Sequence, residues 1–322
     1  MPRRASKSRG NTSMKPTYRI SPSFLMSYGG CQRRILRGVV ERLEPKNQPT
    51  SIEMLFGSSF HKFRELFAKT GMEQEAFALQ QARKVFTEGL HNIYPIAKTK
   101  AHITEDYLVT ACLQFASTYP LKTTVGDFMF CFDSSGDPLT EHHFSVPIYS
   151  CDEFDVALTG VIDGIGIIGQ TLVIEDTKTT SQYNKEEYFE AYSNSPQMLF
   201  YYYIANKIAE AFPTSAFAEL KARTSFFSVS IFGVFMKTRQ VEFERSPLIN
   251  FSDYKLKNYS DSIENKLLEI IDVIHEGHYL KTGMVTGACS SYKSKCPFLK
   301  ACNEDSDEEE NNTIRISYAT RK

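Results

Sequence analysis

The sequence contains DVALTGVID at residues 155–163 and TLVIEDTK at residues 171–178, two stretches rich in β-branched residues. Between them, residues 169–170 read Gly-Gln, which favours a tight turn. Together these stretches predict two antiparallel strands joined as a hairpin. Ile168 and Thr171 flank the turn, so the numbers of facing residues should add to 339.

Two acidic residues face each other in this predicted hairpin. Asp163 and Asp176 have numbers that add to 339, and opposed residues have Cβ atoms roughly 5 Å apart. The carboxylates repel at that distance, and a hard cation such as Mg²⁺ or Mn²⁺ would relieve the repulsion. Lys178 projects from the same face as Asp176, where it could hold a water or offset charge on a phosphate, whereas Glu175 points away. A solvated hairpin face with Lys178 as a plain counter-ion is the structural alternative.

A histidine lies on a predicted helix before the hairpin. The segment FGSSFHKFRELF at residues 56–67 has apolar residues at helical spacing. This spacing places Gly57, His61 and Glu65 on one flank, and a glycine one turn before His61 permits close approach of backbone or phosphate. The alternative is a partly buried histidine that is hydrogen-bonded to Glu65.

A second helix follows the hairpin. In SPQMLFYYYIANKI at residues 195–208, Ser195 suits an N-cap and Pro196 the first helical position. Gln197 then lies in the first turn and Tyr201 lies one turn later on the same face. The N-terminus of a helix attracts phosphate. The alternative is an amphipathic core helix in which Tyr201 only borders the core.

Taken in order, these motifs resemble the PD-(D/E)XK nuclease superfamily, and more narrowly its RecB-like exonuclease branch. The motifs are His61, the GVID that ends at Asp163, the DTK of residues 176–178, and the Gln-xxx-Tyr of residues 197–201. The branch includes CRISPR-adaptation nucleases and phage exonucleases. The resemblance spans roughly residues 20–302. It implies that His61, Asp163 and Asp176 are metal ligands, with the Thr177 carbonyl as an optional fourth ligand. It also implies that Lys178 is the catalytic lysine and that Gln197 and Tyr201 orient the site and the DNA.

Four of the seven cysteines lie near the chain ends, at Cys31, Cys289, Cys296 and Cys302. The branch often carries one N-terminal and three C-terminal cysteines that bind a 4Fe–4S cluster, and the resemblance implies such a cluster here. Thiolates also suit a closed zinc site, and a reducing cytoplasm would keep them free. Disulfides are disfavoured because no secretory signal is visible. The other three cysteines are expected to pack as small apolar residues: Cys112, Cys131 and Cys151.

The composition is that of a globular protein, with 322 residues of which 42% are hydrophobic. No apolar run approaches the roughly 18 residues of a membrane span. The net charge is -1, but residues 304–310 carry six acids, which leaves about +5 on the remainder. A helix that begins at Ser21-Pro22 would present Arg33, Arg34 and Arg37, either to phosphates or to solvent.

The order of the predicted elements gives the fold class and three segments. Residues 1–19 are basic and are expected to form a flexible arm, although an organelle transit peptide has a similar composition. Residues 20–302 are expected to form a single domain with a cysteine clasp, and residues 303–322 a disordered acidic tail. Within the domain, we expect helices over 22–118, strands at about 127–132, 143–149, 155–162 and 171–178, helices over 184–211, strands at about 225–236 and 240–244, and a helix over 253–277. This order predicts an α/β sandwich, a restriction-endonuclease-like central mixed sheet flanked by helices.

The sequence lacks a GxxxxGKS/T phosphate loop, so an ATP-driven helicase is not expected. We expect a Mg²⁺- or Mn²⁺-dependent deoxyribonuclease, an exonuclease that hydrolyses single-stranded or end-exposed DNA in recombination, repair or phage DNA metabolism. Its expected location is the cytoplasm of a bacterial or phage-infected host cell, without membrane contact. The alternatives are a noncatalytic DNA-binding or scaffold subunit of a recombination or CRISPR-adaptation complex, and a metal-binding protein with no nucleic-acid role.

Overall fold

The predicted hairpin forms the centre of the fold. In the computed structural model, β6 (Asp155–Ile168) and β7 (Thr171–Thr180) are antiparallel, and Ile168 lies opposite Thr171. The predicted register is therefore confirmed. Gly169, in the turn, has a φ of +59°, a conformation that a glycine adopts without steric cost.

The structure describes residues 15–46, 49–121, 124–224, 226–238, 240–283, 289, 296–304 and 306–321. Most of the expected basic arm, residues 1–14, lies outside these ranges. Within them, no helix has the length and apolar character needed to cross a membrane.

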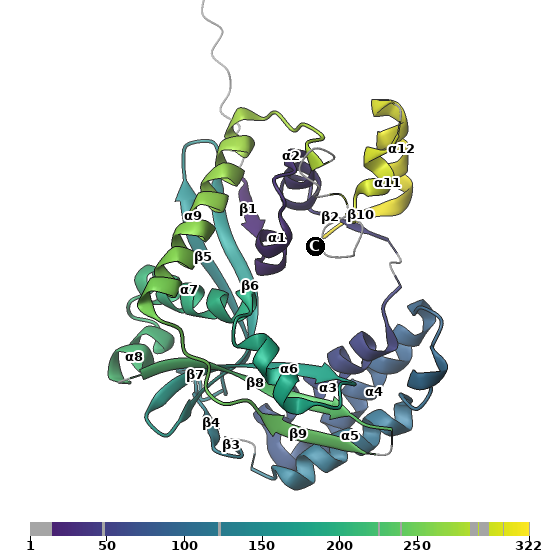
Figure 1. The fold of residues 1–322 in the computed structure, drawn as a ribbon, viewed down its shortest axis with the longest axis vertical. Coiled ribbons are helices and arrows are strands. Elements are labelled where there is room, and N and C mark those ends of the chain that lie inside the picture. The colour runs from purple at the N-terminus through teal and green to yellow at the C-terminus, as the bar shows by residue number, and fades with distance from the viewer. Residues whose placement is uncertain are drawn as a thin grey trace, which may run out of the picture.

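Eight strands, which include the two of the hairpin, form one mixed sheet (Figure 1). Its main order is β3-β4-β6-β7-β8-β9, and β1 and β5 pair with the N-terminal part of β6. The β1–β6 and β7–β8 pairs are parallel, and the other pairs are antiparallel. The remaining strands are β1 (Thr17–Ile20), β3 (Thr124–Val125), β4 (Phe128–Phe130), β5 (Thr140–Ser150), β8 (Phe226–Met236) and β9 (Val241–Arg245).

Helices cover both faces of β7 and β8, because these central strands bury apolar side chains on both sides. Val173 and Phe232 pack against α3 (Ile52–Thr70), α4 (Glu75–Gly89) and α5 (Glu105–Thr118). Ile174 and Ile231 face the other way, toward α7 (Pro196–Ala211) and α9 (Asp253–Glu276). The expected central mixed sheet flanked by helices is confirmed. The shorter helices are α6 (Lys185–Tyr192), α8 (Ala216–Arg223), α11 (Leu299–Cys302) and the single turns Gly71–Gln74, Leu90–Asn92 and Lys98–Lys100.

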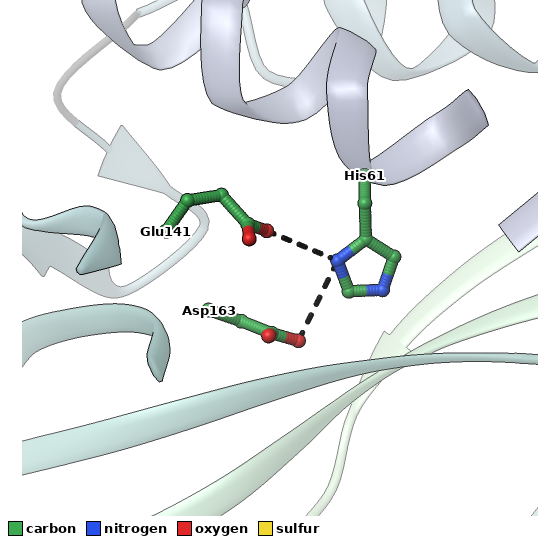
Figure 2. A group of neighbouring side chains, drawn as sticks. All are labelled: His61, Glu141 and Asp163. Carbon is green, nitrogen blue, oxygen red and sulfur yellow. Dashed lines mark hydrogen bonds and ion pairs between the residues drawn. The ribbon is translucent and has the colours of Figure 1, made fainter. Parts of the chain in front are cut away.

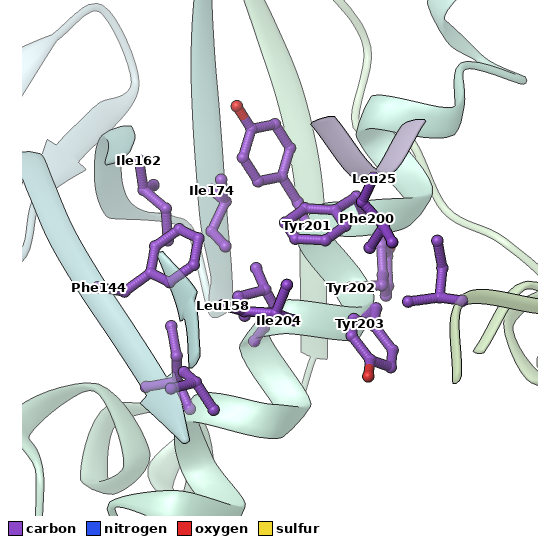
Figure 3. Close-up of a cluster of buried hydrophobic side chains, with 14 of the residues drawn as sticks. Leu25, Phe144, Leu158, Ile162, Ile174, Phe200, Tyr201, Tyr202, Tyr203 and Ile204 are labelled. Atoms are coloured by element: carbon purple, nitrogen blue, oxygen red, sulfur yellow. The ribbon is translucent and has the colours of Figure 1, made fainter. Parts of the chain in front are cut away.

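The helix α7 packs against β6 and β7. Its residues Phe200, Tyr201 and Ile204 pack with Leu158 of β6 and Ile174 of β7, as Figure 3 shows. Ser195 accepts a hydrogen bond from the Gln197 backbone at 3.2 Å, so the predicted N-cap is confirmed. The start of α7 therefore has a fixed position beside the hairpin.

The N-terminal region is more segmented than the sequence suggested. Residues 17–19, predicted to belong to a flexible arm, form β1 together with Ile20 and pair with β6. Ser21 caps α1 (Pro22–Ser27), as predicted, but this helix ends before the arginines. The arginines lie on α2 (Gln32–Ile35) and on the π-helical turn Leu36–Val40 that follows it.

The prediction of a disordered tail at residues 303–322 is wrong. The segment contains α12 (Asp307–Ser317) and β10 (Tyr318–Thr320), and β10 pairs with β2 (Leu43–Pro45). Glu310 is 1% exposed and binds Arg37 at 2.7 Å and Lys281 at 3.1 Å. The acidic segment is ordered because basic side chains distant in sequence neutralise it, and Arg37 therefore faces neither solvent nor phosphate.

Candidate active site

Asp163 lies where β6 and β7 separate. The last pair of the hairpin ladder is Gly164 with Glu175, so the strands diverge beyond it. The backbone N–H of Thr177 instead donates to Asp163 Oδ2 at 2.8 Å. The fork between the strands thus fixes one carboxylate next to the backbone of its neighbour.

Glu141 of β5 lies opposite Asp163, along the edge of β6 that faces away from β7. The flanking pairs of the β5–β6 ladder are Thr140 with Gly164 and His142 with Ile162, so Glu141 and Asp163 meet between them. Glu141 has a φ of +46°, in the left-handed region. A residue with a side chain pays on the order of 1–3 kcal/mol for such a conformation, which concentrates at functional sites.

A β-bulge determines that Glu141 occupies this place. The register of β5 against β6 shifts between Pro147 and Tyr149, so paired numbers add to 305 next to the connecting loop at residues 151–154 and to 304 beyond the bulge. Without that shift, His142 would lie opposite Asp163. The sequence interpretation missed Glu141, since a hairpin count through residues 143–149 gives no sign of the bulge.

His61 reaches the two carboxylates from α3, as Figure 2 shows. Its Nδ1 is 3.2 Å from Glu141 Oε1 and 3.6 Å from Asp163 Oδ2. Its Nε2 is 3.0 Å from the carbonyl oxygen of Thr177, which can only accept, so Nε2 carries a proton. Burial lowers the pKa of His61, but the hydrogen bond to Glu141 and the charges of Asp163 and Glu141 outweigh it and raise the pKa above 6.5.

Gly57 explains how α3 comes so close to the sheet. A Cβ at this position would lie 2.8 Å from Oγ1 of Thr179 on β7. The predicted close approach is therefore one between the helix and the strand. Glu65 binds Lys62 at 2.9 Å and Lys69 at 2.8 Å, and not His61, so the alternative of a His61–Glu65 pair is wrong.

The side chains of His61, Glu141 and Asp163 form a group that could hold a cation. Their ligand atoms all lie within 4.8 Å of one another. Two carboxylates and one imidazole suit Mg²⁺ or Mn²⁺, and the hydrogen bond from Nε2 to Thr177 orients Nδ1 toward the carboxylates. The backbone strain at Glu141 is a further sign that this geometry matters.

Asp176 lies in a separate, polar corner of the same site. Its side chain is 2% exposed, and Oδ1 accepts hydrogen bonds from Tyr201 Oη at 2.6 Å and Gln197 Nε2 at 3.0 Å. Oδ2 forms an ion pair with Lys178 Nζ at 2.7 Å. Burial and the charge of Asp163 raise the pKa of Asp176, whereas Lys178 and Tyr201 lower it in part.

Lys178 and Tyr201 are in defined protonation states near neutral pH. Burial lowers the pKa of Lys178, but the charge and hydrogen-bonding of Asp176 outweigh this and raise it, so the side chain is a cation. Burial is the main cause that raises the pKa of Tyr201 well above 10, so the hydroxyl remains a neutral donor. The structure thus brings together both hairpin acids, the lysine, Gln197 and Tyr201.

A buried ion-pair network supports Thr177 from the other face of β7. Arg64 donates to Oγ1 of Thr177 and to Oε1 of Glu175. Glu175, which is 0% exposed, also accepts from Arg245 Nε. The prediction that Glu175 points away from the site is confirmed, since its partners lie on the opposite side from Asp176.

The family model for the PD-(D/E)XK nuclease superfamily matches residues 19–303. The chain belongs to the PD-(D/E)XK nuclease superfamily. No match to a curated protein was found. PD-(D/E)XK nucleases usually use divalent metals, and the His61, Glu141 and Asp163 group gives this nuclease an acidic site at the expected hairpin.

Two of the four terminal cysteines of the nuclease come together at Gly283. A Cβ on Gly283 would lie 3.0 Å from Sγ of Cys31 and 3.0 Å from Sγ of Cys289. The Cys296 N–H donates to the Cys289 carbonyl at 2.9 Å. Burial, then Glu310 and the nearby thiols, raise the pKa of Cys302 to about 11. In the described parts of the chain, no three of these sulfurs lie within 4.8 Å of one another.

The other three cysteines pack in apolar surroundings, as predicted. Cys112 and Cys131 are buried in the two core clusters, and Cys151 packs at the edge of one of them. Burial raises the pKa of the Cys131 thiol to about 11. These thiols therefore take no part in the terminal group.

Proposed function

We propose that this nuclease is a divalent-metal-dependent deoxyribonuclease of the RecB-like branch, an exonuclease acting on single-stranded or end-exposed DNA. The observation that carries the proposal is the convergence of His61, Glu141 and Asp163 beside the intact pair of Asp176 and Lys178. A scaffold subunit would have no use for a lysine held as a cation next to this group. We place the activity in recombination, repair or phage DNA metabolism, in the cytoplasm of a bacterial or phage-infected host cell.

The proposed metal site uses the side chains of His61, Glu141, Asp163 and Asp176. The Thr177 carbonyl, predicted as an optional fourth ligand, accepts from His61 Nε2 on the far side of the ring, so we give it the role of orienting His61. A divalent cation, when bound, supplies positive charge that polarises the scissile phosphate and favours ionisation of the attacking water. Mg²⁺ and Mn²⁺ fit best, since most of these ligands are oxygens.

The chain's own residues position the reactants. Lys178 Nζ, 2.7 Å from Asp176 and at a side chain that is 29% exposed, can hold the attacking water on the open side of the site. The water oxygen gives up a proton to solvent and forms a bond to phosphorus, and the bond from phosphorus to the leaving sugar oxygen breaks as that oxygen takes up a proton from solvent. The Lys178 charge opposes the negative charge that builds up on the phosphate. Gln197 and Tyr201 keep Asp176 in one orientation.

We further propose that Cys31, Cys289, Cys296 and Cys302 hold a 4Fe–4S cluster. The convergence of Cys31 and Cys289 on Gly283 supports a shared ligand. The same four thiolates would also suit a closed zinc site, and visible absorbance and iron content distinguish the two groups.

The test is cleavage of end-labelled single-stranded, duplex and circular DNA, with and without Mg²⁺ or Mn²⁺. We expect metal-dependent release from the ends of linear DNA and no cutting of circles. Asp163→Asn and Lys178→Ala should abolish the release, while Asp261→Asn, an exposed aspartate on α9, should leave it unchanged. Cutting of circles would refute exonuclease action, and full activity in Asp163→Asn would refute the metal site.

A further inference from the structure

A concave site lies away from the candidate active site. It is a pocket of about 540 Å³, lined by residues of β1, α1, α2, β2 and the segment after β10. These elements lie close together in the upper part of Figure 1. Residues from both ends of the chain therefore form one pocket.

The walls of this pocket are strongly basic. They carry four guanidinium groups and one carboxylate, from Arg19, Arg34, Arg42, Arg321 and Glu44. Arginine stays charged at every physiological pH, so the pocket has an excess of fixed positive charge. This excess contrasts with the net charge of -1 of the whole chain.

Local contacts hold several of these groups in position. Arg34 donates to Ser27 Oγ at 2.7 Å, and its guanidinium lies 5.7 Å from the ring centre of Phe24. Arg321 binds Glu44 at 2.9 Å, and its backbone N–H donates to the Arg42 carbonyl at 2.8 Å. The basic wall is thus built into the junction of the two chain ends.

The pocket lies on the strand that carries Asp163. Thr159 of β6 lines the pocket and precedes Asp163 by four residues, which corresponds to roughly 13 Å along a strand. Alternation places Thr159, Val161 and Asp163 on one side of β6. Val161, between them, is 38% exposed, so this side of the strand is open to solvent.

We propose that the pocket binds a backbone phosphate of the nucleic-acid substrate, a few nucleotides from the scissile phosphate. Guanidinium groups bind phosphate through paired, charge-assisted hydrogen bonds. A strand that follows the open side of β6 would place one phosphate at Asp163 and another at Arg19, which lies on β1 opposite Ala157. The inference rests on the proposed nuclease function and explains how a nearly neutral chain holds an anionic strand.

The test measures binding separately from cleavage. A fluorescently labelled single-stranded DNA oligonucleotide is titrated in EDTA across a salt series, and its anisotropy gives the affinity. The double variant Arg19→Gln/Arg321→Gln should bind several-fold more weakly. Its slope of log affinity against log salt should fall by about 0.7 for each phosphate that the variant no longer neutralises. The matched control is Arg83→Gln/Arg223→Gln, at exposed arginines of α4 and α8, which should bind like wild type.

A minimal phosphodiester, the p-nitrophenyl ester of thymidine 5′-phosphate, provides the second arm. It fills only the scissile position, so the double variant should cleave it as wild type does, while its KM for the oligonucleotide rises. Equal affinity in the two double variants, or equal loss of activity on both substrates, would overturn the proposal. If wild type cleaves nothing but binds DNA in an Arg19-dependent manner, the pocket stands and the nuclease function fails. If wild type cleaves DNA and Arg19→Gln/Arg321→Gln binds the oligonucleotide as wild type does, the nuclease function stands and the pocket proposal fails.

Discussion

Replacing Glu175 by glutamine should destabilise the fold by about 3–5 kcal/mol, the usual cost of removing one partner from a buried ion pair. Glu175 is 0% exposed, and its oxygens accept from Arg64 and Arg245. Glutamine has nearly the same size, so the change removes a charge without creating a cavity. The Arg64 guanidinium, 4% exposed, would then be buried without its counter-ion.

The expected change in melting temperature follows from the length of the chain. A chain of 322 residues has an unfolding entropy of about 0.7 kcal/mol/K, so the loss should lower Tm by about 4–7 °C. Urea unfolding followed by circular dichroism gives the free energy, and calorimetry gives Tm. The matched control is Glu244→Gln, an exposed glutamate of β9 that binds Lys185 and should contribute less than about 1 kcal/mol.

Metal binding gives a second readout of the same variant. Arg64 also donates to Thr177, whose carbonyl orients His61. A loosened Arg64 should therefore weaken Mn²⁺ binding at Glu141 and Asp163 in calorimetry, even at temperatures where the variant is folded. If Glu175→Gln is no less stable than Glu244→Gln, the reasoning about the buried network is refuted.

Further predictions concern the acids, the aromatic donor and the cysteines. Asp176→Asn should abolish metal-dependent cleavage and leave the circular dichroism spectrum unchanged, because it removes charge while two of its hydrogen bonds can persist; full activity would contradict the assignment. Tyr201→Phe should slow cleavage less than Asp176→Asn and leave metal affinity unchanged in calorimetry, since Tyr201 only orients the acid; an equal loss of affinity would make it a ligand. Cys31→Ser should bleach the visible absorbance of anaerobically purified protein and lower its Tm, whereas Cys112→Ala should leave the absorbance unchanged; colourless protein with one zinc would replace the cluster. Burial raises the pKa of Glu310, but its hydrogen bonds to basic side chains outweigh this and lower the pKa below 4.5. The contribution of Glu310 to the free energy of unfolding is therefore present above pH 4.5 and is lost as the pH falls through the folded-state pKa. The difference in unfolding free energy between wild type and Glu310→Gln should thus be largest near about pH 7 and shrink toward about pH 3, and a constant difference would refute it.

The parts of the site that depend on local sequence were predictable. The two-residue turn at 169–170 fixes the hairpin register as far as Gly164 and Glu175, and this brings Asp163 and Asp176 to the fork just beyond the last pair. The helical period through His61 and the N-cap at Ser195 likewise depend on neighbours within a few residues. Such short-range patterns survive in the folded chain because tertiary packing reinforces them.

Features that depend on distant partners were not predictable. Glu141 reaches Asp163 through a bulge that leaves no mark in the composition of β5. The acidic C-terminal segment is ordered because Glu310 meets Arg37, which lies 273 residues earlier. Charge density alone predicted disorder there, because a sequence does not display which charges become neighbours.

The bulge in β5 also restricts how this gene can vary. Phe144 and Val146 point into the core, while Glu141 lies on the alternate side of the strand, facing Asp163. Inserting or deleting one residue between Glu141 and the bulge shifts one part of β5 relative to β6. If the shift turns Phe144 and Val146 toward solvent, the core loses their packing. If it places a neighbour of Glu141 beside Asp163, the metal site loses a ligand. We therefore expect the length of this segment to be invariant among relatives, even where its side chains differ.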